Sequence, residues 1–67
     1  SSDPTLAAAV RQLPPQRRLV VFLRYFADLS YAEIGEVLGI AEGTVAATLS
    51  QAHRQLGDAL SANEVMA

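Results

Sequence analysis

The sequence predicts a small all-α domain of four helices, and three kinds of observation support this fold class. Apolar residues recur at three- and four-residue spacing along most of the chain, which is the period of a helix with one buried face. Proline and glycine interrupt that period at Pro14, Pro15 and Gly39. Ser30 followed by Glu33 is the pattern of a helix start. The chain has 67 residues, which is enough for one domain.

The first predicted helix begins at Pro4, with Asp3 as its cap, and its apolar positions are Leu6, Val10 and Leu13. It ends after roughly two turns, because Pro14 and Pro15 lack the amide hydrogen that a helix interior needs. Residues 1–4 are therefore expected to be the end of a linker, with the domain occupying residues 5–60.

Pro15 can open the second helix. Four apolar residues with helical spacing are expected to form its buried face: Leu19, Phe22, Leu23 and Phe26. Tyr25 is expected in the core beside Phe26, although its place at the edge of the apolar face also allows a contact with a partner.

The third helix is expected to start at Ser30, where Ser30 and Glu33 can each bond to the other's backbone amide. Gly39 suits the left-handed conformation that ends a helix. The fourth helix should begin near Ala41 or Glu42, with an apolar stripe of Val45, Leu49, Ala52, Leu56 and Leu60. Residues 61–67 have weak periodicity and are expected to fray.

The spacing of Gly35, Gly39 and Val45 predicts a helix-turn-helix over about residues 31–50. This motif needs a small residue where its two helices cross, a glycine in the turn and a branched apolar residue between the helices. Those needs are met by Gly35, Gly39 and Val45 respectively. The alternative is that the two glycines only punctuate an ordinary helical hairpin.

Composition excludes several classes of function. The chain has no cysteine and one histidine, His53, so it offers neither a thiolate metal site nor a histidine pair, and we expect no metal or cofactor. Its carboxylates are scattered and it has no glycine-rich phosphate loop, so we expect no enzyme and no small-molecule substrate. No apolar run approaches the roughly 20 residues of a membrane span. We expect a cytoplasmic protein.

Charge is divided unevenly along the chain. Residues 1–24 carry four arginines against Asp3, whereas residues 25–67 carry Arg54 against six acidic residues. Proteins that bind nucleic acid are usually basic on the binding face, because neutralising phosphates supplies much of the affinity. The acidic second half therefore argues for weak binding to nucleic acid.

Several segments in order resemble region 4 of sigma-70 family sigma factors, most closely the extracytoplasmic-function (ECF) group. They are Leu13-Pro14-Pro15, Leu23-Arg24-Tyr25-Phe26, Leu29-Ser30-Tyr31-Ala32-Glu33-Ile34 and Leu38-Gly39-Ile40-Ala41-Glu42-Gly43-Thr44-Val45. The resemblance covers about residues 5–60. It implies a winged-helix-like bundle of three to four helices, whose last helix enters the major groove of the minus-35 promoter element. It also implies double-stranded promoter DNA, the beta flap of RNA polymerase core and an anti-sigma factor as partners.

Helical geometry predicts which residues of the last helix meet DNA, because they lie opposite its apolar stripe or near its N-terminus. These residues are Glu42, Gly43, Thr44, Ala46, Ala47, Thr48, Ser50, Gln51 and Arg54. Gln51 can pair with adenine, and alanine can contact a thymine methyl group. Arg54 could pair instead with Asp58, four residues on. Backbone contacts are expected from Arg17, Arg18 and Arg24, which could equally be solvated side chains.

The predicted DNA surface is less basic than that of ECF relatives. Here five residues occupy positions that are often basic there: Ala46, Thr48, Gln51, His53 and Gln55. Weak DNA affinity follows, so two further hypotheses stay open. One is a protein-interaction module of the same fold, whose last helix binds an anti-sigma factor or polymerase. The other is a stand-alone helix-turn-helix regulator.

Overall fold

The computed structural model describes residues 4–66, with side chains described for residues 6–60. Over this range the chain forms four helices, and it forms no strand there. They are α1 (Pro4–Arg11), α2 (Pro15–Tyr25), α3 (Tyr31–Leu38) and α4 (Glu42–Met66). The predicted all-α class with four helices is confirmed.

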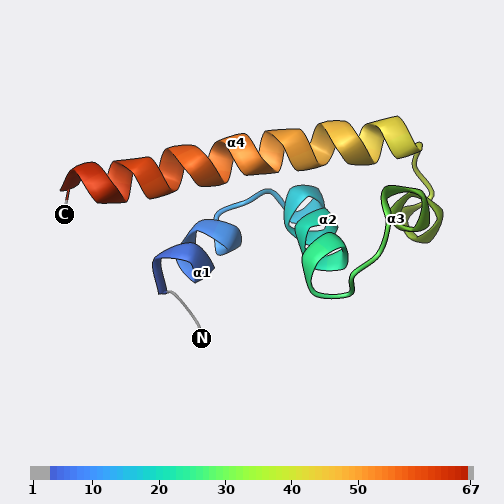
Figure 1. Ribbon diagram of the computed structural model, residues 1–67, viewed down its shortest axis with the longest axis horizontal. Coiled ribbons are helices and arrows are strands. Elements are labelled where there is room, and N and C mark those ends of the chain that lie inside the picture. The colour runs from blue at the N-terminus through green and yellow to red at the C-terminus, as the bar shows by residue number, and fades with distance from the viewer. Residues whose placement is uncertain (1–3, 67) are drawn as a thin grey trace.

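Helix α4 is the longest helix and packs against the other three. Its 25 residues run along the whole length of the described part, whose extents are 40 × 23 × 16 Å. The three shorter helices lie along one side of it, with α3 beside its N-terminal end, α2 beside its middle and α1 towards its C-terminal end (Figure 1). The N-terminal half of α4 is therefore supported by α2 and α3, which leaves its opposite side to solvent.

The helix boundaries follow local signals in the sequence. Pro15 is the first residue of α2, where a missing amide hydrogen costs nothing. Before α3, the Ser30 hydroxyl accepts from the Glu33 amide at 3.1 Å, and the Glu33 carboxylate accepts from the Ser30 amide at 2.8 Å. Gly39 ends α3 with φ of 70°, a left-handed conformation in which glycine carries no steric penalty.

The core lies where α4 meets the other helices. Its buried side chains are Leu13, Val20, Val21, Ile34, Val45, Leu49 and Ala52. The apolar stripe predicted for α4 is confirmed, because Val45, Leu49 and Ala52 are buried and Leu56 and Leu60 are half-buried. Packing of this stripe against α2 and α3 fixes the direction of α4.

The predicted buried face of α2 is wrong. Leu23 is half-buried, but Leu19, Phe22 and Phe26 are 43%, 53% and 79% exposed. The residues that pack against the core are instead Val20 and Val21. The physical reason is that residues 19–23 are all apolar, so helical spacing is satisfied on more than one side of α2 and does not choose between them. Tyr25, also expected in the core, is 56% exposed.

The ends of the chain differ from expectation in one respect. The structure continues α4 to Met66, six residues beyond the predicted end of the domain at residue 60. At the other end, Pro4 is already the first residue of α1, while residues 1–3 of the expected linker lie outside the described residues.

Candidate nucleic-acid interface

The turn between α3 and α4 is built on a close approach of two backbones. Gly35 is buried, and a Cβ atom at this position would lie 2.7 Å from the carbonyl oxygen of Ile40. The Gly35 carbonyl in turn accepts from the amides of Gly39 and Ile40, the latter at 3.0 Å. Val45 is fully buried beneath this crossing. All three residues predicted to shape a helix-turn-helix therefore occupy the positions that the motif requires.

Helix α4 starts immediately after this turn. The Ala41 carbonyl accepts from the amides of Thr44 and Val45, at 3.0 and 3.1 Å. Glu42 is the first residue of the helix and places an acidic group near its positive end. The first turn of α4 therefore stands at one end of the molecule (Figure 1), where it can be approached by a partner.

Most of the predicted DNA-contacting residues lie on the accessible side of α4. Those that are exposed are Glu42, Gly43, Thr44, Ala47, Ser50, Gln51 and Arg54. Ala46 is half-buried. Thr48 differs from the prediction: it is 8% exposed, and its hydroxyl donates to the Thr44 carbonyl at 2.7 Å. Because its side chain is buried and its hydroxyl proton is committed to its own helix, Thr48 offers no donor to a base or a phosphate.

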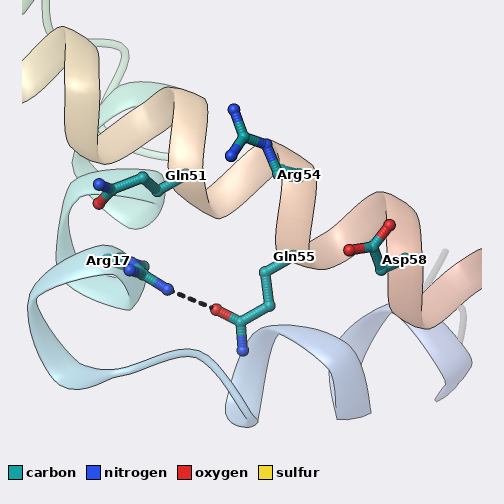
Figure 2. Close-up of a pocket in the computed structure, with 5 residues that line it drawn as sticks. All are labelled: Arg17, Gln51, Arg54, Gln55 and Asp58. Carbon is teal, nitrogen blue, oxygen red and sulfur yellow. Dashed lines mark hydrogen bonds between the residues drawn. The ribbon is translucent and has the colours of Figure 1, made fainter.

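A polar groove lies between α2 and α4, and Figure 2 shows the side chains that line it. They are Arg17, Gln51, Arg54, Gln55 and Asp58. Within the groove, Arg17 Nη1 donates to Gln55 Oε1 at 2.9 Å, which links the two helices. Gln55 Nε2 also donates to the Gln12 carbonyl at 3.5 Å. The half-buried guanidinium of Arg17 is thereby held at a defined place beside α4.

Arg54 is available to a ligand. Its side chain and that of Asp58 point in different directions in Figure 2, and no ion pair joins them. The predicted alternative, an ion pair between Arg54 and Asp58, is therefore not formed. Arg17 of α2 and Arg54 of α4 both border the groove, which is therefore lined by two guanidinium groups and by the one carboxylate of Asp58.

The other two arginines of α2 are engaged within the chain. Arg18 Nη1 donates to the Arg11 carbonyl at 3.3 Å, and Arg24 Nη1 donates to the Leu29 carbonyl at 3.4 Å. The Arg24 guanidinium also lies 5.8 Å from the ring centroid of Tyr25 and 5.7 Å from that of Tyr31. Arg24 therefore braces the loop between α2 and α3, a role that the sequence did not suggest.

Helix α3 carries two exposed acidic residues, Glu33 and Glu36. The pKa of Glu33 is lowered by the hydrogen bond from the Ser30 amide and, secondly, by that from the Ser30 hydroxyl. Glu33 therefore stays ionised and repels phosphates, whereas the arginines of the groove attract them.

A second exposed feature, which we call the aromatic surface, consists of Phe22 and Tyr25 on α2 and of Phe26, which caps its C-terminal end. All three side chains are more than half exposed. The rings of Phe22 and Phe26 stack with centroids 5.5 Å apart. The Tyr25 hydroxyl lies 2.7 Å from His53 Nε2, within hydrogen-bonding distance, which ties this surface to α4. Exposed apolar patches of this kind mark sites of protein association.

Sequence reasoning missed the aromatic surface except for the edge position of Tyr25. A signal was nonetheless present, because the stretch from Leu19 to Leu23 is apolar without a break. A helix on the surface of so small a domain cannot bury all sides of such a stretch. His53 is exposed as expected, although its hydrogen-bond partner was not foreseen.

Other kinds of site find no support in the described residues. No group of three or more potential metal ligands comes together among them. None of the helices is both long enough and apolar enough to cross a membrane.

Comparison with known proteins agrees with the geometry. A family model described as sigma-70, region 4 matches residues 5–56. The chain is 46% identical over 57 residues to the RNA polymerase sigma factor FliA of Pseudomonas aeruginosa. It is 43% identical over 56 residues to the ECF RNA polymerase sigma factor SigE of Mycolicibacterium smegmatis. These matches cover 85% and 84% of the chain but 22% of each relative, so the chain spans about a fifth of their length. The chain belongs to the sigma-70 region 4 family, and its helix-turn-helix is that of a sigma factor DNA-binding domain.

Proposed function

We propose that this chain recognises the minus-35 element of a promoter and thereby directs RNA polymerase to start transcription. The observation that carries the proposal is the crossing of α3 and α4 at Gly35, which presents the N-terminal half of α4 on a rigid support. In helix-turn-helix proteins the second helix enters the major groove by its N-terminal end. The domain would perform no catalytic step, and it would act in the cytoplasm, beside the polymerase.

Phosphate contacts in this proposal come from the groove between α2 and α4. Arg54 is exposed and Arg17 is held in the same groove by Gln55, so both guanidinium groups can meet the backbone that flanks the major groove. With few cations available, the affinity for DNA is low. Attachment to polymerase and to a second promoter-binding domain raises the effective concentration of the domain and offsets this weakness.

The aromatic surface is proposed as the docking site for the beta flap of the polymerase. Phe22 and Phe26 expose stacked rings, and exposed aromatic rings are typical anchors of protein interfaces. The surface lies on α2, whereas the proposed DNA contacts lie on α4 and at the groove. The domain could therefore bind polymerase and DNA at the same time. An anti-sigma factor that covers either surface would block the function.

The test is selection from a pool of random duplex DNA at about 50 mM and about 200 mM salt, followed by sequencing of the bound fraction. We expect one short enriched motif at low salt, and its loss when Gln51 and Arg54 are both replaced by Ala. Replacement of Arg11, an exposed arginine at the end of α1, is the matched control and should preserve the motif. Absence of any motif at low salt would contradict the proposal.

A protein-interaction module of the same fold is the second candidate, favoured by the aromatic surface and by the acidic groups Glu33, Glu36 and Glu42. The two candidates differ in salt dependence. Binding to DNA weakens steeply as salt rises, because it releases counterions. A tight complex with a helical protein partner that changes little with salt, together with no selected DNA motif, would favour the second candidate.

A further inference from the structure

The exposed face of α4 has an unusual balance of hydrogen-bonding groups. The ionised carboxylate of Glu42, at the first position of the helix, offers acceptors only. Gln51 is exposed, and its amide offers both a donor and an acceptor. Arg54 is the only cationic side chain of α4, and it borders the groove that it shares with Arg17. The part of α4 before Gln51 therefore has no cationic donor.

This balance bears on which bases the helix can read. Guanine presents two acceptors in the major groove, O6 and N7, and is normally read by the paired donors of Arg or by Lys. Glu42 cannot donate to these acceptors and repels them. Adenine presents one acceptor and one donor, which the amide of Gln51 matches in both roles.

Arg54 and Gln51 line the same groove but offer different chemistry. Arg54 follows Gln51 by three residues, which is about 4.5 Å along the helix axis. It shares the groove with Arg17, which is itself fixed by the 2.9 Å bond to Gln55. A guanidinium group suits a phosphate and a neutral amide suits a base edge, so Arg54 is assigned to the DNA backbone and Gln51 to a base.

We propose that Gln51 is the specificity-determining residue of α4 and that it selects adenine. This inference rests on the proposed function, because it concerns the same interface. It goes further in assigning a base to a named side chain.

The experiment compares the wild-type chain with two variants that each gain one positive charge, Gln51→Arg and Gln16→Arg. Gln16 is exposed at the start of α2 and borders a hollow with Leu38 and Ile40, outside the groove that Gln51 lines. Circular dichroism first verifies that each variant is folded. Each protein then selects from random duplexes at low salt. We expect adenine at one position for the wild type and for Gln16→Arg. For Gln51→Arg we expect guanine to be enriched over adenine at that position by about ten-fold or more.

A second measurement leaves the protein unchanged. Replacing the selected adenine by 7-deazaadenine removes N7, the acceptor for the Gln51 amide, and should weaken wild-type binding several-fold. The same replacement should have little effect on Gln51→Ala, and little effect on the wild type when made at a flanking adenine. Equal losses for the wild type and Gln51→Ala would overturn the assignment to Gln51.

The outcomes separate this inference from the proposed function. A wild-type motif without a required adenine, or the same motif for all three proteins, overturns the inference but leaves a DNA-binding domain. Failure of all three proteins to enrich any motif overturns both.

Discussion

Gly35 and Ile40 approach so closely that a side chain at residue 35 has no room: its Cβ would lie 2.7 Å from the Ile40 carbonyl oxygen. The obstacle is backbone rather than the end of a flexible side chain, so it cannot move aside cheaply. The same carbonyl belongs to the turn that sets the direction of α4. The angle between α3 and α4, and with it the presentation of the proposed reading helix, depends on the absence of one methyl group.

Replacement of Gly35 by Ala should therefore lower the free energy of unfolding by about 2 kcal/mol, a cost typical of overpacking. The control is Gly57→Ala in α4, where an added Cβ meets nothing within 4 Å. That change should stabilise the domain by about 0.5–1 kcal/mol, because alanine favours a helix more than glycine. Urea unfolding followed by circular dichroism measures both. Similar effects of the two changes would contradict the close approach.

Ser30 should contribute to stability through its cap. Ser30→Ala removes the acceptor of the Glu33 amide and should cost about 1 kcal/mol. Ser50→Ala removes the same hydroxyl from an exposed position within α4 and should change stability by less than about 0.5 kcal/mol. Thermal unfolding of the two variants gives the comparison, and an equal loss from both would rule out a capping role for Ser30.

Stability should also depend on pH through Glu33. Its pKa is lowered in the folded chain, chiefly by the hydrogen bond from the Ser30 amide. Its contribution is therefore fully present above the unfolded pKa of a glutamate, about 4.3, and is lost as pH falls through the lower folded pKa. Glu33→Gln should remove this part of the acid sensitivity, measured as urea unfolding across acidic pH. An unchanged acid dependence in Glu33→Gln would show that the hydrogen bonds do not favour the carboxylate.

The boundaries of the helices could be predicted because they depend on residues near in sequence. Pro15, the pair of Ser30 and Glu33, and Gly39 each act on the backbone within a few residues. The buried side of α2 could not be predicted in the same way. It is chosen by α4, which is distant in sequence, and a stretch that is apolar all round gives no local preference.

The candidate interface was predictable to the extent that helix geometry determines exposure. Seven of the nine predicted positions on α4 are exposed. Thr48 was misplaced because it lies at the edge of the buried stripe, where its hydroxyl can return to the Thr44 carbonyl. The contacts of Arg17 with Gln55 and of Tyr25 with His53 join residues 38 and 28 positions apart, so only the tertiary structure reveals them.

Truncation of a buried side chain of α2 and of an exposed ring at its C-terminal end should affect different properties, stability in the first case and partner binding in the second. Val20 is fully buried, and Val20→Ala should cost about 2 kcal/mol through lost burial and the cavity left behind. Phe26 is 79% exposed, so Phe26→Ala should cost less than about 1 kcal/mol although it removes more atoms. Phe26→Ala should instead weaken binding to polymerase in a pull-down assay. A loss of stability with unchanged polymerase binding would place the docking site elsewhere.

Arg54 should determine part of the salt dependence of DNA binding. If its guanidinium neutralises one phosphate, Arg54→Ala lowers the slope of log affinity against log salt concentration by about 0.9. Arg11→Ala removes the same charge from the end of α1 and should leave this slope unchanged, because Arg11 does not line the groove. Fluorescence anisotropy on the selected duplex at several salt concentrations provides both slopes. Equal slopes for wild type and Arg54→Ala would mean that Arg54 does not contact the backbone, and the groove with Arg17 would then have another ligand.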